Sequence, residues 1–143
     1  MMRAILIFLI TTFTFITASC QDKGKVPQSV LKTFQEMYPN EDDPDFKQDA
    51  HGYWEAHFKK DGEKYRADFL ADGSWRETEN SIKEKNLPKA VKAAIKKHYG
   101  DEEITEVEHV LSAKYGEFYD VEFKQKGKNK DVMYRKDGSI IQE

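Results

Sequence analysis

Residues 53–62 read YWEAHFKKDG and residues 118–127 read FYDVEFKQKG, and this pair of stretches decides the fold. The similarity continues in FLADGS at 69–74 and YRKDGS at 134–139, at the same offset of 65 residues and without a gap. A duplication of this length indicates an architecture built from two similar units. We therefore expect two tandem repeats.

Each duplicated stretch is predicted to form antiparallel strands joined by tight turns. Asp61-Gly62, Asp72-Gly73 and Asp137-Gly138 are typical of two-residue hairpin loops, in which both central residues need a positive φ. Lys126-Gly127 is expected to form such a loop in the second repeat. A loop at Asp61-Gly62 places six apolar residues on one face, which is consistent with strand alternation. These residues are Trp54, Ala56, Phe58, Tyr65, Ala67 and Phe69.

The Lys126-Gly127 loop likewise pairs Val121 with Val132 and Tyr119 with Tyr134. We expect both sets of apolar residues to face a helix.

A segment with helical spacing of apolar residues precedes each set of strands. These segments are 26–38 and 87–99, and each has a proline near its start, where a helix tolerates the missing N–H. A first strand is expected at 46–49, and 104–112 takes its place in the second repeat.

The predicted fold class is therefore α+β. It consists of two tandem repeats, each a helix packed on an antiparallel β-meander of about four strands. The expected boundaries are 26–79 for the first repeat, 80–86 for a linker and 87–143 for the second repeat.

The N-terminal segment is predicted to direct export. Residues 1–19 carry one charge, Arg3, followed by an apolar run, which is typical of a secretory signal peptide. Cys20, the single cysteine of the chain, follows directly and resembles the acylated cysteine of a bacterial lipobox, with Thr17 where that motif usually has Leu. Residues 20–25 are expected to be a tether behind a lipidated Cys20. The alternative is ordinary signal cleavage nearby.

Charge and motifs exclude several classes of function. After removal of residues 1–19 the 23 basic residues fall to 22 against 26 acidic ones, which argues against a nucleic-acid partner. The four histidines show no zinc-ligand spacing, and no nucleophile, phosphate-binding or dinucleotide motif is present. We expect no enzymatic activity, no metal and no cofactor.

The two units of a Val/Leu-Pro helix followed by strands with Asp-Gly turns resemble the PepSY-like, beta-lactamase-inhibitor-protein-like family. The resemblance covers residues 26–143 and rests on turn and fold patterns. It implies a non-catalytic protein in the periplasm or on the surface of a Gram-negative bacterium. It also implies that the sheet face without helices binds another protein of the envelope or the extracellular space.

Strand alternation assigns twelve residues to that helix-free face as a candidate protein-binding surface. An ordinary solvated face is the alternative. Trp75 is left open, because a two-residue loop at Asp72-Gly73 places it on this face and a three-residue loop places it in the core. The twelve residues are Tyr53, Glu55, His57, Arg66, Asp68, Leu70, Phe118, Asp120, Glu122, Asp131, Met133 and Arg135.

The same register sets Glu55 opposite Asp68 and Glu122 opposite Asp131, and like charges across a strand pair are unfavourable. These pairs suggest a cationic partner, either a basic protein patch or a divalent ion. The alternative is neutralisation by Arg66, Arg76 and Arg135. Three functions follow from the sequence: a lipid-anchored binding or inhibitor-like module, a structural envelope lipoprotein without a specific ligand, or a sensor for a cation or small ligand.

Overall fold

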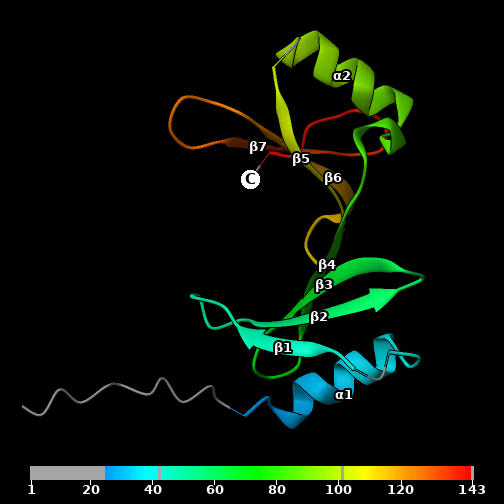
Figure 1. The fold of residues 1–143 in the computed structure, drawn as a ribbon, viewed down its shortest axis with the longest axis vertical. Helices are drawn as coiled ribbons and strands as arrows, with labels where there is room; N and C mark the ends of the chain where they lie inside the picture. The colour runs from blue at the N-terminus through cyan, green and yellow to red at the C-terminus, as the bar shows by residue number, and fades with distance from the viewer. Residues whose placement is uncertain (1–24, 42, 101, 143) are drawn as a thin grey trace, which may run out of the picture.

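The computed structural model describes residues 25–41, 43–100 and 102–142 of the chain. The predicted signal peptide 1–19, the lipidation site Cys20 and all but the last residue of the tether 20–25 lie outside the described residues. The described residues form seven antiparallel strands in one sheet, in chain order from β1 to β7, and two α-helices (Figure 1). No helix in the described ranges has the length and apolar character needed to cross a membrane. The elements are α1 (Gln28–Met37), β1 (Asp45–Gln48), β2 (Trp54–Lys60), β3 (Glu63–Phe69), β4 (Trp75–Ser81), the short 3-10 helix η1 (Glu84–Asn86), α2 (Lys89–Tyr99), β5 (Ile104–Ser112), β6 (Gly116–Phe123) and β7 (Lys130–Tyr134).

Both helices form where the apolar spacing predicts them. α1 follows Pro27 and α2 follows Pro88, so each begins two residues after the predicted start. Each helix directs two buried apolar side chains, four residues apart, toward the sheet, because residues i and i+4 lie on the same helix face. The buried pairs are Val30 with Phe34 in α1 and Val91 with Ile95 in α2.

The Asp61-Gly62 hairpin has the predicted register. Lys60 pairs with Glu63 across a two-residue loop, and Trp54 pairs with Phe69 at its far end. Asp61 has φ 52° and Gly62 has φ 82°, the positive values that this loop requires.

The predicted two-residue loop at Lys126-Gly127 is wrong. β6 ends at Phe123 and β7 begins at Lys130, so the connection runs over residues 124–129. Gly127 has a positive φ, but Lys126 does not, and a type I′ turn needs both. The pairing of Tyr119 with Tyr134 and of Val121 with Val132 nevertheless holds, because the longer loop keeps the same register.

The Asp72-Gly73 turn is the three-residue alternative, and it places Trp75 on the core side. The N–H of Leu70 donates to the carbonyl of Ser74, and Phe69 pairs with Trp75 after a register shift in β3. Trp75 is half-buried against the α1 cluster, and its Nε1 donates to Thr78 Oγ1 at 2.9 Å. Trp75 therefore packs against the core, as the three-residue loop predicts.

The sheet runs without a break from β4 into β5. Residues 80 and 81, which the sequence assigns to a linker, belong to β4 and pair with His109 and Glu108 of β5. The second half has three strands and a single bridge between Tyr134 and Ile140, instead of about four strands. The chain therefore forms one mixed α and β structure with a single antiparallel sheet.

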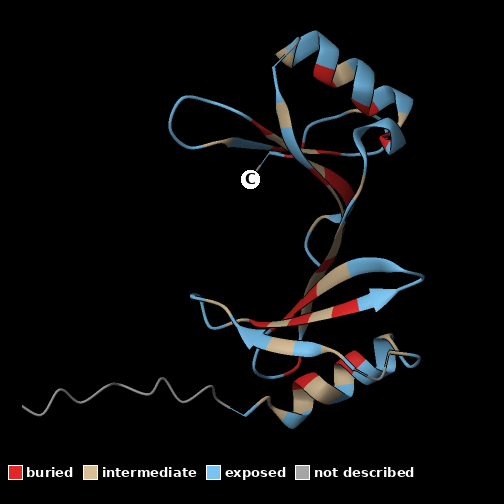
Figure 2. Cartoon of the chain, in the orientation of Figure 1, coloured by how far each residue is buried: buried red, intermediate tan, exposed pale blue. Residues whose placement is uncertain are grey.

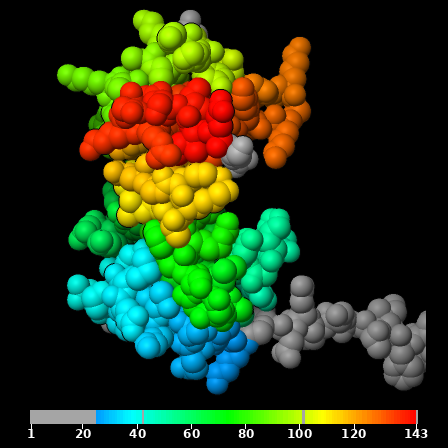
Figure 3. All heavy atoms as spheres, turned by 180° about the vertical axis from the view of Figure 1, so that it is seen from behind, coloured from blue at the N-terminus to red at the C-terminus, as the bar shows by residue number. Residues whose placement is uncertain are grey.

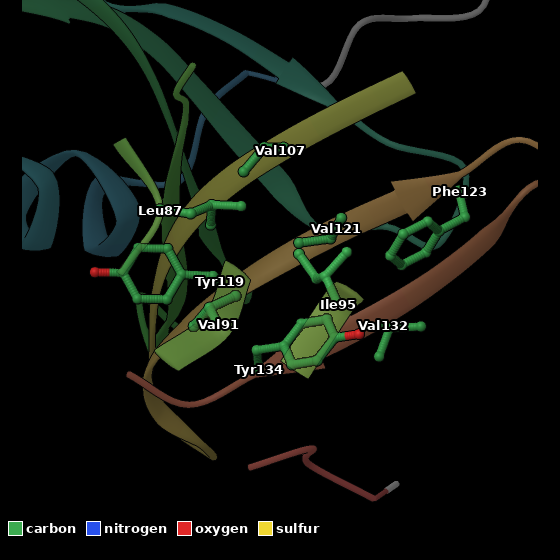
Figure 4. Close-up of a cluster of buried hydrophobic side chains, with 9 residues drawn as sticks. All are labelled: Leu87, Val91, Ile95, Val107, Tyr119, Val121, Phe123, Val132 and Tyr134. Carbon is green, nitrogen blue, oxygen red and sulfur yellow. The ribbon is translucent and has the colours of Figure 1, made fainter. Parts of the chain in front are cut away.

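Most of the buried apolar residues gather in two clusters, one beneath each helix (Figure 2), and Figure 4 shows the α2 cluster. The ten sheet residues expected to face the helices all lie in or against these clusters. The α1 cluster holds Val30, Phe34, Trp54, Ala56, Phe58, Ala67 and Phe69, with Tyr65 packed against it. The α2 cluster holds Leu87, Val91, Ile95, Val107, Tyr119, Val121, Phe123, Val132 and Tyr134.

Both helices cover the same face of the sheet. The strand pairings from β2 to β7 place the side chains of both clusters on that one face. The sheet curves, so that α1 and α2 lie at its outer ends and the helix-free face lines the inside of the curve (Figure 1). We call this helix-free side the open face.

Candidate functional site

The open face holds the twelve residues predicted for protein binding, and the structure separates them by exposure. Leu70, Asp131 and Arg135 are exposed, while Asp68 and Phe118 are buried. The other seven are half-buried: Tyr53, Glu55, His57, Arg66, Asp120, Glu122 and Met133.

Phe118 lies on the predicted helix-free face but is buried there. Phe118 is 3% exposed and packs with Val110 and Ile141 in a third apolar cluster, with Tyr115 and Met133 against it. The C-terminal segment turns back onto the open face, where the N–H of Ile141 donates to the carbonyl of Met133 at 2.9 Å. Seen from behind, the red C-terminal residues lie directly against the yellow residues around the β5–β6 turn (Figure 3). No pattern in the sequence signals this return of the chain.

The two predicted acid pairs are in register but differ in their surroundings. Glu55 lies opposite Asp68, and burial raises the pKa of Asp68 to about 6, an effect that Arg66 reduces and Glu55 increases. Glu122 lies opposite Asp131, but hydrogen bonds from Thr105 and Asn129 lower its pKa. Only the first pair carries an electrostatic cost.

The three arginines named as neutralising groups have different partners. Arg66 lies 3.4 Å from Asp68 Oδ1 and 2.7 Å from Glu79 Oε1. Arg76 lies over the ring of Tyr53, 3.9 Å from its centroid, and Arg135 donates to the backbone oxygen of Tyr115. Arg66 is the arginine that pairs with acids of the open face.

Acidic side chains of β4 and β5 join the open face, and the sequence analysis missed them. Burial and the nearby Glu108 together raise the pKa of Glu79 to about 8. The pKa of Glu108 is raised by burial as well, and the two carboxyl groups share a hydrogen bond. The alternation in Glu77-Thr78-Glu79 and Glu106-Val107-Glu108 is the signal that could have found this group.

A hollow of about 430 Å³ lies on the open face between β4, β5, β6 and β7 and the β5–β6 turn. One part of its wall is apolar and comes from the third cluster, and another part is acidic. Asp120 stands between the two, and its Oδ1 is buried with no hydrogen-bond partner in the described ranges. Burial, together with the nearby Asp131 and Glu108, raises the pKa of Asp120 to about 6. The apolar residues of the wall are Trp75, Val110, Ala113, Tyr115, Phe118 and Met133, the acidic ones are Glu77, Glu79 and Asp120, and the basic ones are Arg76 and Lys114.

The hollow brings acidic and apolar side chains side by side, with Arg76 and Lys114 also in its lining. Within the described residues no three His, Cys, Asp or Glu side chains are placed to hold a metal ion. Of the histidines, His57 contacts Glu55 on the open face, and His109 contacts Glu117 on the helix-covered side. The acids can accept hydrogen bonds from a cationic group, and the apolar wall can pack against an aliphatic or aromatic one.

Three solved structures with the same fold come from Bacteroides. A BLIP-like protein of Bacteroides fragilis NCTC 9343 is 24% identical, with 85% of this chain and 89% of that chain covered and a TM-score of 0.71. A DUF2874 family protein of Bacteroides ovatus ATCC 8483 is 23% identical, with 83% and 87% covered and a TM-score of 0.71. A protein of Bacteroides eggerthii DSM 20697 described as periplasmic is 20% identical, with 83% and 88% covered and a TM-score of 0.70.

None of the curated proteins matches the chain. The family model described as beta-lactamase-inhibitor-like and PepSY-like matches residues 52–142, which is more than half of the sequence. The match agrees with the resemblance in the repeated strands and turns, and the three structures share the fold over most of their length. The chain therefore belongs to the PepSY-like, beta-lactamase-inhibitor-like family.

Proposed function

We propose that this protein is an exported, lipid-anchored binding or inhibitor-like module without enzymatic activity, built from two PepSY-like repeats. Its open face contacts another protein of the bacterial envelope. The description of its family as beta-lactamase-inhibitor-like supports a role in binding.

One observation carries this proposal: the open face is curved inward and contains the 430 Å³ hollow, whose wall combines aromatic, Met and acidic side chains. Aromatic residues and Met are enriched at the centres of protein interfaces. Both helices lie on the other face, so their packing leaves this surface accessible to a partner. A sheet with only a structural role would not need a hollow that combines apolar and charged side chains.

The proposed location follows from residues 1–20. The apolar segment followed by the single Cys20 supports export and attachment to a membrane through a lipid. The periplasm is also the location given for the Bacteroides eggerthii relative.

The proposed repeat is supported by a contact that occurs in both halves. The β3–β4 turn at Gly73 approaches the backbone oxygen of Ser29 in α1, and the turn at Gly138 approaches that of Ala90 in α2. Each helix therefore rests on an Asp-Gly turn of its own half.

The test is an affinity capture from the envelope extract of the source bacterium, with the parent protein and two variants. Met133→Arg adds a large charged group to the hollow, and Leu111→Arg adds the same group to the opposite side of the sheet, where Leu111 is 45% exposed. We expect a partner that the parent and Leu111→Arg both retain and that Met133→Arg loses. Thermal melts confirm that both variants are folded. A partner retained equally by all three proteins would contradict the use of the open face.

A further inference from the structure

The charges of the open face are unbalanced at its centre. Glu79 of β4 and Glu108 of β5 lie close enough to share a hydrogen bond, and Asp120 of β6 lies directly opposite Glu108. Among the described residues Arg66 forms an ion pair with this group, through Glu79, and a second one with Asp68. Arg76 and Lys114 also line the hollow, against the three acids Glu77, Glu79 and Asp120. A buried carboxylate is costly unless a cation or several donors compensate it. The acids are thus compensated incompletely within the described chain.

Two carboxylate oxygens show this deficit directly. Oδ1 of Asp68 is buried and accepts no hydrogen bond from a described residue, and the side chain is only 9% exposed. Arg66 Nε stands 3.4 Å from it without donating. Oδ1 of Asp120 is buried and lacks a donor as well, and this side chain lines the hollow. Buried polar atoms nearly always have a partner in native proteins, so Oδ1 of Asp120, which has no ion pair with a described residue, points to a donor from outside the described residues, whereas Asp68 keeps its ion pair with Arg66.

The shape of the hollow matches one kind of donor. Tyr115, Phe118 and Met133 form an apolar wall beside the carboxylates of Asp120 and Glu77. A Lys or Arg side chain has an aliphatic stem that packs on apolar surface and a cationic end that donates several hydrogen bonds. The structure already contains a local example, because Lys114 Nζ lies 4.5 Å from the centroid of the Tyr115 ring at the same hollow.

We propose that the open face docks a basic protein surface, with a Lys or Arg side chain of that partner entering the hollow beside Asp120 and Glu77. This inference rests on the proposed function and specifies the chemistry of its partner. A divalent ion is the less suitable occupant, because the described residues hold no group of three side chains placed to bind one. A second copy, through the lysines on the outer face of α2, is an outcome that the test must separate.

The experiment measures binding of fluorescently labelled hexalysine and hexaarginine peptides to the purified protein by anisotropy at 50 mM salt, with a hexaglutamate peptide as the reference. We expect both basic peptides to bind, and the affinity to fall as salt rises. The double variant Glu77→Gln, Asp120→Asn should weaken binding at least tenfold, because it removes two carboxylates at the hollow. The matched control Glu36→Gln, Glu84→Gln makes the same change in net charge on α1 and η1 and should weaken binding less than twofold.

Three results would overturn the inference. The first is no binding of the basic peptides, and the second is an equal loss of affinity in the control variant, which would mean attraction by net charge alone. The third is tight binding of Ca²⁺ that depends on Asp120 and displaces the peptides. Sedimentation at several protein concentrations detects self-association. A dimer that the Lys89→Gln, Lys96→Gln variant cannot form would mean that the docked basic surface belongs to a second copy of this chain.

The capture experiment separates this inference from the proposed function. A partner lost with Met133→Arg but unaffected by Glu77→Gln, Asp120→Asn would support docking on the open face and contradict a cationic group in the hollow.

Discussion

Arg66 of β3 is joined to Glu79 of β4, with Nη2 of Arg66 2.7 Å from Oε1 of Glu79. This contact places a positive charge beside the carboxyl groups of Asp68, Glu79 and Glu108, which all have a raised pKa because burial disfavours their charged forms. Asp120 on β6 belongs to the same group. Burial and further acids raise its pKa, and no arginine lowers it. These carboxyl groups therefore destabilise the free protein most at high pH, where they are charged.

The first prediction concerns pH and Asp120. A carboxyl group whose pKa is raised in the folded state binds its proton more tightly there than in the unfolded chain. The free energy of unfolding therefore falls as pH rises from about 4 through about 6. Asp120→Asn removes this loss, so at pH 8 the variant should be more stable than the parent by about 1–2 kcal/mol. At pH 4, where Asp120 is protonated in the folded parent, the two should be equal within about 0.5 kcal/mol.

Asp137→Asn is the control for this prediction. Hydrogen bonds from the side chain and N–H of Ser139 lower the pKa of Asp137, so its stabilising contribution is present at neutral pH and lost on acidification. This variant should be less stable than the parent at pH 8, opposite in sign to Asp120→Asn. Urea unfolding at pH 4 and pH 8 measures both variants, and equal effects of Asp120→Asn at the two pH values would contradict the burial of its charge.

The second prediction concerns the apolar cluster of α1. Phe69 is fully buried, and Phe69→Ala should lower the free energy of unfolding by about 3–5 kcal/mol, a large part of the stability of a small domain. Its neighbour Leu70 points to the other face and is 39% exposed, so Leu70→Ala should cost about 0.5 kcal/mol or less. Denaturant melts of the two variants compare the two faces of the sheet at the end of β3. A loss below about 1 kcal/mol for Phe69→Ala would mean that the faces are reversed.

The third prediction concerns the turns on which the helices rest. A Cβ at Gly73 would lie 2.7 Å from the backbone oxygen of Ser29, and one at Gly138 would lie 2.6 Å from that of Ala90. Gly62 and Gly127 also have positive φ, but a Cβ there would meet open space. Ala at these two control positions should cost about 1 kcal/mol from backbone strain alone. Gly73→Ala and Gly138→Ala should cost at least about 1 kcal/mol more, because the helix must shift. Equal losses at all four glycines would show that the turns do not support the helices.

The sequence predicted the elements whose signals are local. Alternation around Asp61-Gly62 was enough to pair Trp54 with Phe69, and i, i+4 spacing was enough to place Val91 and Ile95 toward the sheet. The site was predicted less completely, because it depends on the pairing of β4 with β5, which brings Glu79 to Glu108 across the two halves. The fold-back that buries Phe118 is also non-local, since Ile141 and Val110 are far apart in the chain.

The fourth prediction concerns the anchor. Cys20 is the only cysteine, so a radiolabelled fatty acid supplied to the source bacterium should label the parent protein and not Cys20→Ala. The variant should also move from the membrane fraction to the soluble fraction, unless its uncleaved signal peptide retains it, which a gel comparison of the two sizes reveals. An unlabelled parent that still partitions with membranes would contradict lipidation of Cys20.

The most direct measurement is photocrosslinking inside the source bacterium, with a benzophenone amino acid placed at Met133 or at Leu111. Met133 lines the hollow of the open face, and Leu111 is exposed on the helix-covered side of the same sheet. We expect a discrete crosslinked protein from position 133 and none from position 111. The partner surface around the crosslink should be basic. The absence of a crosslink at position 133, or the same product from both positions, would contradict docking on the open face.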